Sequence, residues 1–281
     1  MRHLVLTGAL LAGVAVGGCS AGEPASLGRN ASPPAASTLP ATTTTLAGPT
    51  ELGRALVAAE TAIRDPTTPT ARITTIGQAQ QQAYGTLVAR PEWDAEVLAN
   101  VPEPLRATVE ANVAAGRELK ALSGPVEPDR PLPKWRIVAP DPADELLPLY
   151  KAAGAAAGVP WPYLAAIHLV ETRMGRIKGD STAGAQGPMQ FIPSTWDIYG
   201  QGGDITSNRD AIFAAARLLR ASGAPSNMAR ALRAYNNSAR YVTAVTYYAG
   251  QITADERAYL GYHAWQVYYG PRLLPEGTVL G

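Results

Sequence analysis

The segment from residue 144 to residue 270 is the part of the chain that most restricts the fold. It reads as consecutive short helices separated by Gly, Pro and Asn, and patterns that alternate apolar with polar residues are nearly absent. Pro162 stands near the start of an almost wholly apolar run, which is where a helix tolerates proline. The sequence therefore predicts a mainly α-helical domain over residues 143–281.

Two further helix starts are predicted inside this domain. Asn208 precedes the apolar-periodic run 210–219, in the position of an N-terminal cap. Thr253 and Glu256 have the spacing of a capping box, in which each side chain satisfies a backbone N–H of the first turn. We therefore expect the last helix to cover residues 259–268.

The first residues of the chain have the features of an export signal. Basic residues precede the uncharged run 4–16, which is too short to cross a bilayer, and the run ends in Val-Gly-Gly-Cys at 16–19. This ending resembles a bacterial lipoprotein processing box. We expect a lipoprotein signal peptide at 1–19 and a lipid on Cys19, which is the only cysteine. A plain secretory signal cut near Ala21 and an uncleaved apolar helix are the alternatives.

Three segments separate the signal from the predicted domain. Residues 20–49 are rich in Ser, Thr and Pro and almost lack large apolar side chains, which predicts a disordered tether. Residues 50–123 show helical periodicity but no pattern of acids, histidines or glycines that resembles a site, so we interpret them as a helical spacer or packing subdomain. Residues 124–142 form a Pro-rich connection in which Trp135 and Ile137 are expected to lie on the following domain.

Charge and composition exclude one class of partner. The 281 residues carry a formal net charge of only +1, and nothing suggests the broad basic surface that nucleic acid requires. We therefore expect no nucleic-acid partner. A hydrophobic fraction of 46% is compatible with a well-packed helical protein.

Glu171 is the strongest candidate for a catalytic group. It lies on one helical stripe with Ile167 and His168, among apolar neighbours and near the end of its helix. Burial and the carbonyls of the helix C-terminus both disfavour the carboxylate anion, so the pKa should rise as a general acid requires. The alternative is an ion pair of Glu171 with Arg173 or Arg176. For His168 the simpler interpretation is a buried packing histidine.

Three ordered motifs strengthen the catalytic interpretation. Glu171-Thr172 is followed by Ala-Gly-Ala-x-Gly-x-x-Gln-Phe-x-Pro-Ser at residues 183–194 and then by Tyr235-Asn236. In this order and spacing the motifs resemble the lysozyme-like lytic transglycosylases, and among them the membrane-bound B type, over about residues 146–251. The resemblance implies a lysozyme-like helical transglycosylase domain, here with an N-terminal helical extension.

The resemblance also implies a role for each matching residue. Glu171 matches the single catalytic acid/base, and Gln190 matches a glutamine that lines the sugar groove. Tyr235 and Asn236 match a pair near the catalytic carboxylate and the N-acetyl group of the substrate, and Ser181 matches a serine close to the same acid. The alternatives are a loop-capping amide for Gln190 and a packing ring for Tyr235.

The implied chemistry needs only one protein carboxylate. Ordinary glycosidases use two acids, but the acetamido oxygen of an N-acetylated sugar can replace the nucleophile. Glu171 would protonate the oxygen between N-acetylmuramic acid and N-acetylglucosamine, then remove the proton of the muramoyl C6 hydroxyl to give a 1,6-anhydro product. Asp180, the nearest other acid in the sequence, reads as a turn residue.

No metal or cofactor is expected. Some B-type members carry an acidic, Gly-rich calcium loop after the Gln-Phe-x-Pro-Ser motif. The corresponding residues 200–208 contain only one carboxylate, that of Asp204, and lack the several hard oxygen ligands of a calcium site.

Together these features predict an exported, lipid-anchored, monomeric enzyme that faces the cell wall and acts on peptidoglycan glycan strands. A non-catalytic peptidoglycan-binding lipoprotein is one alternative, because a binding module could use the same groove. A hydrolytic muramidase on the same fold is the other. Retention of the acid together with the motif residues favours the transglycosylase.

Overall fold

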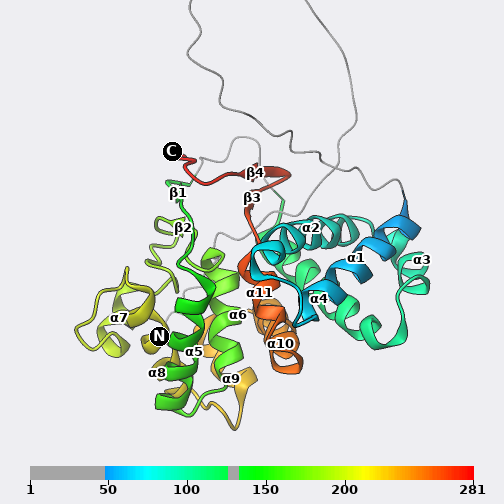
Figure 1. The fold of residues 1–281 in the computed structure, drawn as a ribbon. Helices are drawn as coiled ribbons and strands as arrows, with labels where there is room; N and C mark the ends of the chain where they lie inside the picture. The colour runs from blue at the N-terminus through cyan, green and yellow to red at the C-terminus, as the bar shows by residue number, and fades with distance from the viewer. Residues whose placement is uncertain (1–47, 126–132) are drawn as a thin grey trace, which may run out of the picture.

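A computed structural model describes residues 48–125 and 133–281 (Figure 1). The predicted signal peptide, Cys19 and nearly all of the predicted tether lie outside these residues. Helices contain 63% of the described residues, and the strands are few and short, which confirms the prediction of a mainly α-helical fold. Among the described helices, none combines the length and the apolar character needed to cross a bilayer.

The N-terminal helices form a layer of their own on one side of the molecule (Figure 1). The segment begins at Pro49, where proline occupies the first helical turn without losing a hydrogen bond, one residue inside the predicted tether. Leu52, Leu56 and Ile63 recur on one face of the first helix and are fully buried. The elements are α1 (Pro49–Arg64), α2 (Thr70–Ala89), the short 3-10 helix η1 (Pro91–Trp93), α3 (Asp94–Ala99) and α4 (Glu103–Ser123).

The remaining helices surround α6. Every residue of α6 from Leu164 to Thr172 is buried, which explains why its sequence is apolar on all sides. It packs against α5, α8, α10 and α11. The bounds are α5 (Ala143–Ala157), α6 (Trp161–Thr172), α7 (Pro193–Tyr199), α8 (Asn208–Ala221), α9 (Met228–Tyr235), α10 (Ala239–Ala254) and α11 (Ala258–His263).

The two predicted helix starts need correction. Asn208 lies inside α8, and the cap is Ser207, whose hydroxyl accepts a hydrogen bond from the Asp210 N–H. The predicted capping box is wrong because burial of one face keeps α10 helical as far as Ala254, so the Thr253 hydroxyl donates to a carbonyl of its own helix. The last helix is also shorter than predicted, since Val267–Tyr269 is a strand.

Two small antiparallel ladders close the fold. β1 (Arg136–Ile137) pairs with β2 (Ile177–Lys178), and β3 (Val267–Tyr269) pairs with β4 (Arg272–Leu274). Trp135 and Ile137, at the end of the Pro-rich connection, are buried against apolar residues of the following domain, as the sequence predicted. This second, smaller core comprises Trp135, Ile137, Ile177, Val267, Leu274 and Leu280.

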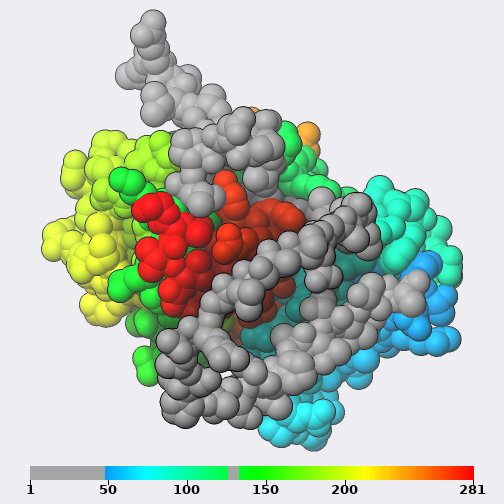
Figure 2. Space-filling model, turned by 90° about the horizontal axis from the view of Figure 1, so that it is seen from above, coloured from blue at the N-terminus to red at the C-terminus, as the bar shows by residue number. Residues whose placement is uncertain are grey.

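The N-terminal helices share one hydrophobic core with the helices around α6. Helix α4 packs along α10, and α2 packs against α11. The approach of α2 to α11 is close, because a Cβ at Gly77 would lie 2.6 Å from the carbonyl oxygen of Gly261. Seen from above, the C-terminal residues in red lie between the yellow-green residues and the cyan N-terminal helices (Figure 2). Residues 50–123 are therefore joined to residues 143–281 by direct packing.

Candidate active site

Glu171 occupies the last turn of α6 and is almost enclosed. Only 9% of its surface is exposed. Burial raises the pKa of its carboxyl group from 4.5 to about 7, although a hydrogen bond from Tyr241 opposes the rise. The Tyr241 hydroxyl donates to Oε1 of Glu171 across 2.7 Å. The carboxyl group is therefore divided between its neutral and ionised forms near neutral pH.

Neither arginine that the sequence offered as an ion-pair partner contacts this carboxylate. Arg173 donates to the backbone carbonyl of Leu169 at 2.9 Å, while Arg176 pairs with Glu276 at 2.6 Å. Among residues 48–125 and 133–281, no cation pairs with Glu171 to stabilise its anion and lower its pKa.

His168, one turn before Glu171 on α6, has a structural role. It is completely buried, and its Nδ1 lies 2.7 Å from the Tyr150 hydroxyl. Burial lowers the pKa of this histidine to about 3, so the ring stays neutral at physiological pH. Its position matches the expectation of a packing histidine.

The Gly-rich loop between α6 and α7 is tied directly to the turn that carries the acid. Thr172, the residue after Glu171, donates its hydroxyl hydrogen to the carbonyl oxygen of Pro188 at 2.6 Å. Gly187 has a φ of 71°, and a Cβ there would lie 1.9 Å from the carbonyl oxygen of Ile205, so only glycine fits. The Thr172 hydrogen bond therefore holds the loop against the end of α6.

Gln190 and Ser181 support their own loops. The Gln190 side-chain amide donates to the carbonyl oxygen of Gly187 at 2.9 Å, which is the loop-capping arrangement that the sequence left open. The Ser181 hydroxyl accepts hydrogen bonds from the N–H groups of Ala183 and Ala185, at 3.2 and 3.0 Å. Neither side chain hydrogen-bonds Glu171, so both shape the loop that borders the acid.

Tyr235 and Asn236 lie at the end of α9 and join the same site. The Tyr235 hydroxyl donates to the carbonyl oxygen of Met189 at 2.6 Å, and its ring lies parallel to that of Tyr241, with centroids 6.3 Å apart. Burial, and after it the nearby Glu171 carboxylate, raises the pKa of Tyr235. Asn236 is 7% exposed, and its Oδ1 is enclosed without a hydrogen-bond partner among the described residues.

Tyr241 is the residue of this site that sequence reasoning missed. It lies on the buried face of α10, where its spacing to Ala244 and Tyr248 is that of any core residue. Only the structure distinguishes it, because its hydroxyl is the donor that Glu171 accepts. The sequence carried only an indirect signal for this residue. A buried carboxyl group requires a hydrogen-bond donor, and the tyrosines after Tyr235 are uncharged side chains that could donate to it.

Other acids stay outside this arrangement. Asp180 is exposed, and its nearest bond is a 3.4 Å contact from the Gln186 amide. Asp204 accepts hydrogen bonds from the N–H and the hydroxyl of Thr206, which form a local turn. Among residues 48–125 and 133–281, no three His, Cys, Asp or Glu side chains are grouped as a metal site would require.

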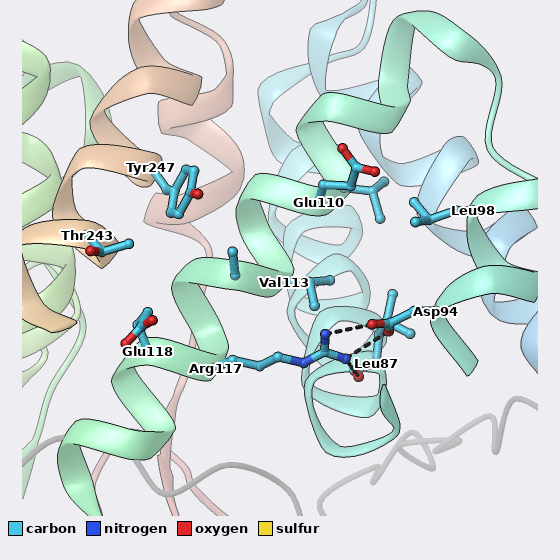
Figure 3. A pocket seen from close by; sticks show the side chains of 11 residues that line it. Leu87, Asp94, Leu98, Glu110, Val113, Arg117, Glu118, Thr243 and Tyr247 are labelled. Carbon is cyan, nitrogen blue, oxygen red and sulfur yellow. Dashed lines mark hydrogen bonds and ion pairs between the residues drawn. The ribbon is translucent and has the colours of Figure 1, made fainter. Parts of the chain in front are cut away.

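A separate hollow lies between α10 and the N-terminal helices (Figure 3). Its volume is about 470 Å³, and residues of α2, α3, α4 and α10 line it. Arg117 and Asp94 form a bidentate pair within it, and Glu118 pairs with Arg240. The acid and the motif residues do not line this hollow, so it is a different site from the one around Glu171.

The fold thus brings one acid with a raised pKa together with two tyrosines, a Gly-rich loop and an amide whose Oδ1 has no partner among the described residues. The residues come from α6, the loop before α7, the end of α9 and the start of α10. No protein-family model, curated protein or solved structure matches the chain. What the site does must therefore be inferred from its own chemistry.

Proposed function

We propose that this protein is a peptidoglycan lytic transglycosylase with a lysozyme-like catalytic domain. It cleaves the β-1,4 bond between N-acetylmuramic acid and N-acetylglucosamine and leaves 1,6-anhydromuramoyl ends. The observation that carries the proposal is Glu171, a buried carboxyl group with a pKa of about 7 and no cationic partner. The order of the three motifs that meet around this acid also supports it.

The first step uses the proton of Glu171. Its Oε1 accepts from Tyr241, and the described residues offer no donor to Oε2, so Oε2 is the oxygen that carries the proton toward substrate. Glu171 donates this proton to the glycosidic oxygen as the bond to the anomeric carbon breaks. The acetamido oxygen of the muramoyl sugar attacks the anomeric carbon, which removes the need for a second protein carboxylate.

The second step uses the same group as a base. The Glu171 carboxylate removes the proton of the muramoyl C6 hydroxyl, whose oxygen then displaces the acetamido oxygen and closes the anhydro ring. The proton lost in the first step is regained, and no water is consumed. Tyr241 stabilises the intermediate carboxylate with a hydrogen bond that is already in place.

Asn236 is suited to hold the acetamido group during these steps. Its side chain is buried, and its Oδ1 has no partner within the described chain, so a substrate N–H would satisfy an otherwise costly polar atom. Gln190 and Ser181 contribute by keeping the loop beside the acid in shape. Tyr235 fixes the same loop through the Met189 carbonyl.

The proposed location follows from the chain start. A lipid on Cys19 would hold a monomeric enzyme at the membrane, with residues 20–47 between the anchor and α1. The catalytic domain would then face the cell wall, where its glycan strands are found.

The products of cell-wall digestion test the proposal. Full-length protein in detergent should release 1,6-anhydromuropeptides from purified sacculi, detected by mass spectrometry. Glu171→Gln should abolish the release, whereas Glu110→Gln, a change at an exposed acid outside the site, should leave it intact. Products with reducing ends would instead identify a muramidase. Binding to sacculi with no product would identify a binding module.

A further inference from the structure

The turn that follows Glu171 has an unusual backbone. Arg173, Met174 and Gly175 all have positive φ values, of 55°, 59° and 82°. Glycine adopts such a conformation readily, but residues with a Cβ do so rarely and only where the surroundings hold them. An arginine at the first of these positions therefore needs a reason beyond the turn itself.

The Arg173 side chain turns back against its own helix. It is only 6% exposed, and its Nη1 donates to the carbonyl oxygen of Leu169, which is one of the last carbonyls of α6. Its Nε is enclosed without a partner, and no carboxylate among the described residues pairs with it. Burial lowers the pKa of this arginine to about 10. A cation is thus enclosed beside the catalytic turn without a counter-ion, a costly arrangement.

Trp265 provides the surface on which the guanidinium rests. The centre of the guanidinium lies 5.6 Å from the ring centroid, within the range of a cation–π contact. The indole N–H of Trp265 donates to Oε1 of Gln80 on α2 at 3.0 Å, and Gln80 in turn donates to Glu60 on α1. The ring contact and the two hydrogen bonds therefore connect the turn after Glu171 to the N-terminal helices.

We propose that Arg173 is a positioning residue for Glu171, and that the N-terminal helices hold it in place through Gln80 and Trp265. The inference rests on the proposed function, because it gives residues 50–123 a role in keeping the acid ready for catalysis. The guanidinium satisfies the Leu169 carbonyl and fills the space behind the turn, so water is excluded from the last turn of α6.

This role acts through burial. The groups that face Glu171 are the hydroxyl of Tyr241 on α10 and the ring of Tyr235 on α9, and neither is charged at neutral pH. Arg173 faces Tyr248 on α10 and the Trp265 ring. Removing the guanidinium should hydrate the turn and let the pKa of Glu171 fall toward that of an exposed glutamate.

The test is a ¹³C-carboxyl NMR titration of Glu171 in the full-length protein, with the resonance assigned by its loss in Glu171→Gln. Arg173→Gly keeps the left-handed turn at no steric cost but removes the side chain. The pKa of Glu171 should fall by at least about 1 unit, and kcat should fall about tenfold with little change in KM. Arg173→Lys should restore part of both values, because it keeps a long side chain behind the turn and a donor for the Leu169 carbonyl but loses the planar fork.

A matched pair elsewhere in the chain provides the control. The guanidinium of Arg90 lies 4.8 Å from the centroid of the Trp93 ring at the end of α2, away from the acid. Arg90→Gly and Trp93→Phe should leave the titration of Glu171 unchanged. Trp265→Phe, which keeps a ring but loses the bond to Gln80, should lower the pKa of Glu171 in the same direction as Arg173→Gly.

The outcomes separate the two proposals. If Glu171 still titrates near pH 7 in Arg173→Gly, the arginine only stabilises the fold and the inference fails. Should that variant not fold, the titration of Trp265→Phe decides in the same way. If the titration shifts as expected but wild-type protein yields no anhydro products, positioning stands and the proposed function fails.

Discussion

Two buried glutamates, one in each half of the molecule, have opposite surroundings. Glu60 on α1 is fully enclosed and accepts hydrogen bonds from Arg64, Gln80 and Tyr84. Glu171 on α6 is nearly as buried, yet within the described part of the chain it has a single donor, Tyr241, and no cationic partner. The Glu60 carboxylate has three hydrogen-bond donors around it, whereas the Glu171 carboxylate has one.

Glu60 thus has the surroundings of a structural acid, and those of Glu171 fit the acid/base role that we propose for it. A buried carboxylate that is fully partnered rigidifies its surroundings. A buried carboxylate with one neutral donor can exist in both protonation states near neutral pH, as a group that gives and then takes a proton must. Depth of burial is similar in the two cases, so the two carboxyl groups differ mainly in their hydrogen-bond partners.

Breaking the Glu60 network should have the largest effect on stability. Glu60→Ala removes the carboxylate that pairs with Arg64 and leaves the Gln80 and Tyr84 donors without their shared acceptor. Loss of one member of such a network is expected to cost about 3–5 kcal/mol of unfolding free energy. Urea unfolding at pH 7 measures this cost. A loss below about 1 kcal/mol would show that the network contributes little to stability. Glu60 would then no longer serve as the structural counterpart of Glu171.

The sequence predicted the first half of this contrast poorly. Residues 50–123 show helical periodicity, and helices α1 to α4 occupy this segment. Periodicity carries no information about which helix of one half meets which helix of the other. The network that joins Glu60 to Trp265 depends on side chains far apart in the chain, so only the fold reveals it.

The stability of the protein should depend on pH through Glu171. Its folded pKa of about 7 lies above the unfolded value of 4.5, so the folded state binds this proton more tightly. The resulting stabilisation is fully present below pH 4.5 and is lost as pH rises through 7. Linkage gives about 3 kcal/mol for the whole change.

Glu171→Gln isolates this contribution. The variant cannot ionise at this position, so its unfolding free energy relative to wild type should rise by about 3 kcal/mol between pH 4.5 and pH 8. Urea titrations of both proteins at the two pH values measure the difference, and other titrating groups cancel. A difference that does not change with pH would mean that the carboxyl group is hydrated and unsuited to general acid catalysis.

Each of the two glutamates accepts a hydrogen bond from one tyrosine, Tyr84 for Glu60 and Tyr241 for Glu171. Tyr84→Phe leaves Glu60 with Gln80 and Arg64, so we expect a loss of about 1 kcal/mol in stability and no change in the pH dependence of activity. Tyr241→Phe removes the one donor that the described residues offer to Glu171, and that bond lowers the pKa of the acid. The basic limb of the pH–rate profile should therefore move to higher pH, with a rate about tenfold lower at the optimum.

The opposite result would exchange the roles of the two networks. A pH profile that moves in Tyr84→Phe but not in Tyr241→Phe would place the titrating acid in the N-terminal half. Measurement of kcat/KM from pH 4 to pH 9 on the same sacculus preparation distinguishes the two cases. Melting temperatures of both variants show whether either change acts only through stability.

Sequence reasoning located the second glutamate but not the hydrogen bonds that its neighbours make. The apolar stripe around Glu171 was sufficient to predict burial and a raised pKa, because both depend on the helix that carries it. Gln190 caps its own loop, an arrangement that depends on a positive φ no motif can reveal. Tyr241 was missed since its role depends on how α10 crosses α6.

The smallest expected effect concerns Asp180, the acid closest to Glu171 in the loop sequence. It is exposed, and its one bond, to the Gln186 amide, is long at 3.4 Å. If one carboxyl group performs both proton transfers, Asp180→Asn should change kcat/KM by less than about twofold, since an exposed hydrogen bond contributes little. A hydrolytic muramidase would need a second carboxylate to activate water, and the same substitution would then abolish activity. The measured rate of this variant, compared with that of Glu171→Gln, therefore distinguishes a single-acid site from a two-acid site.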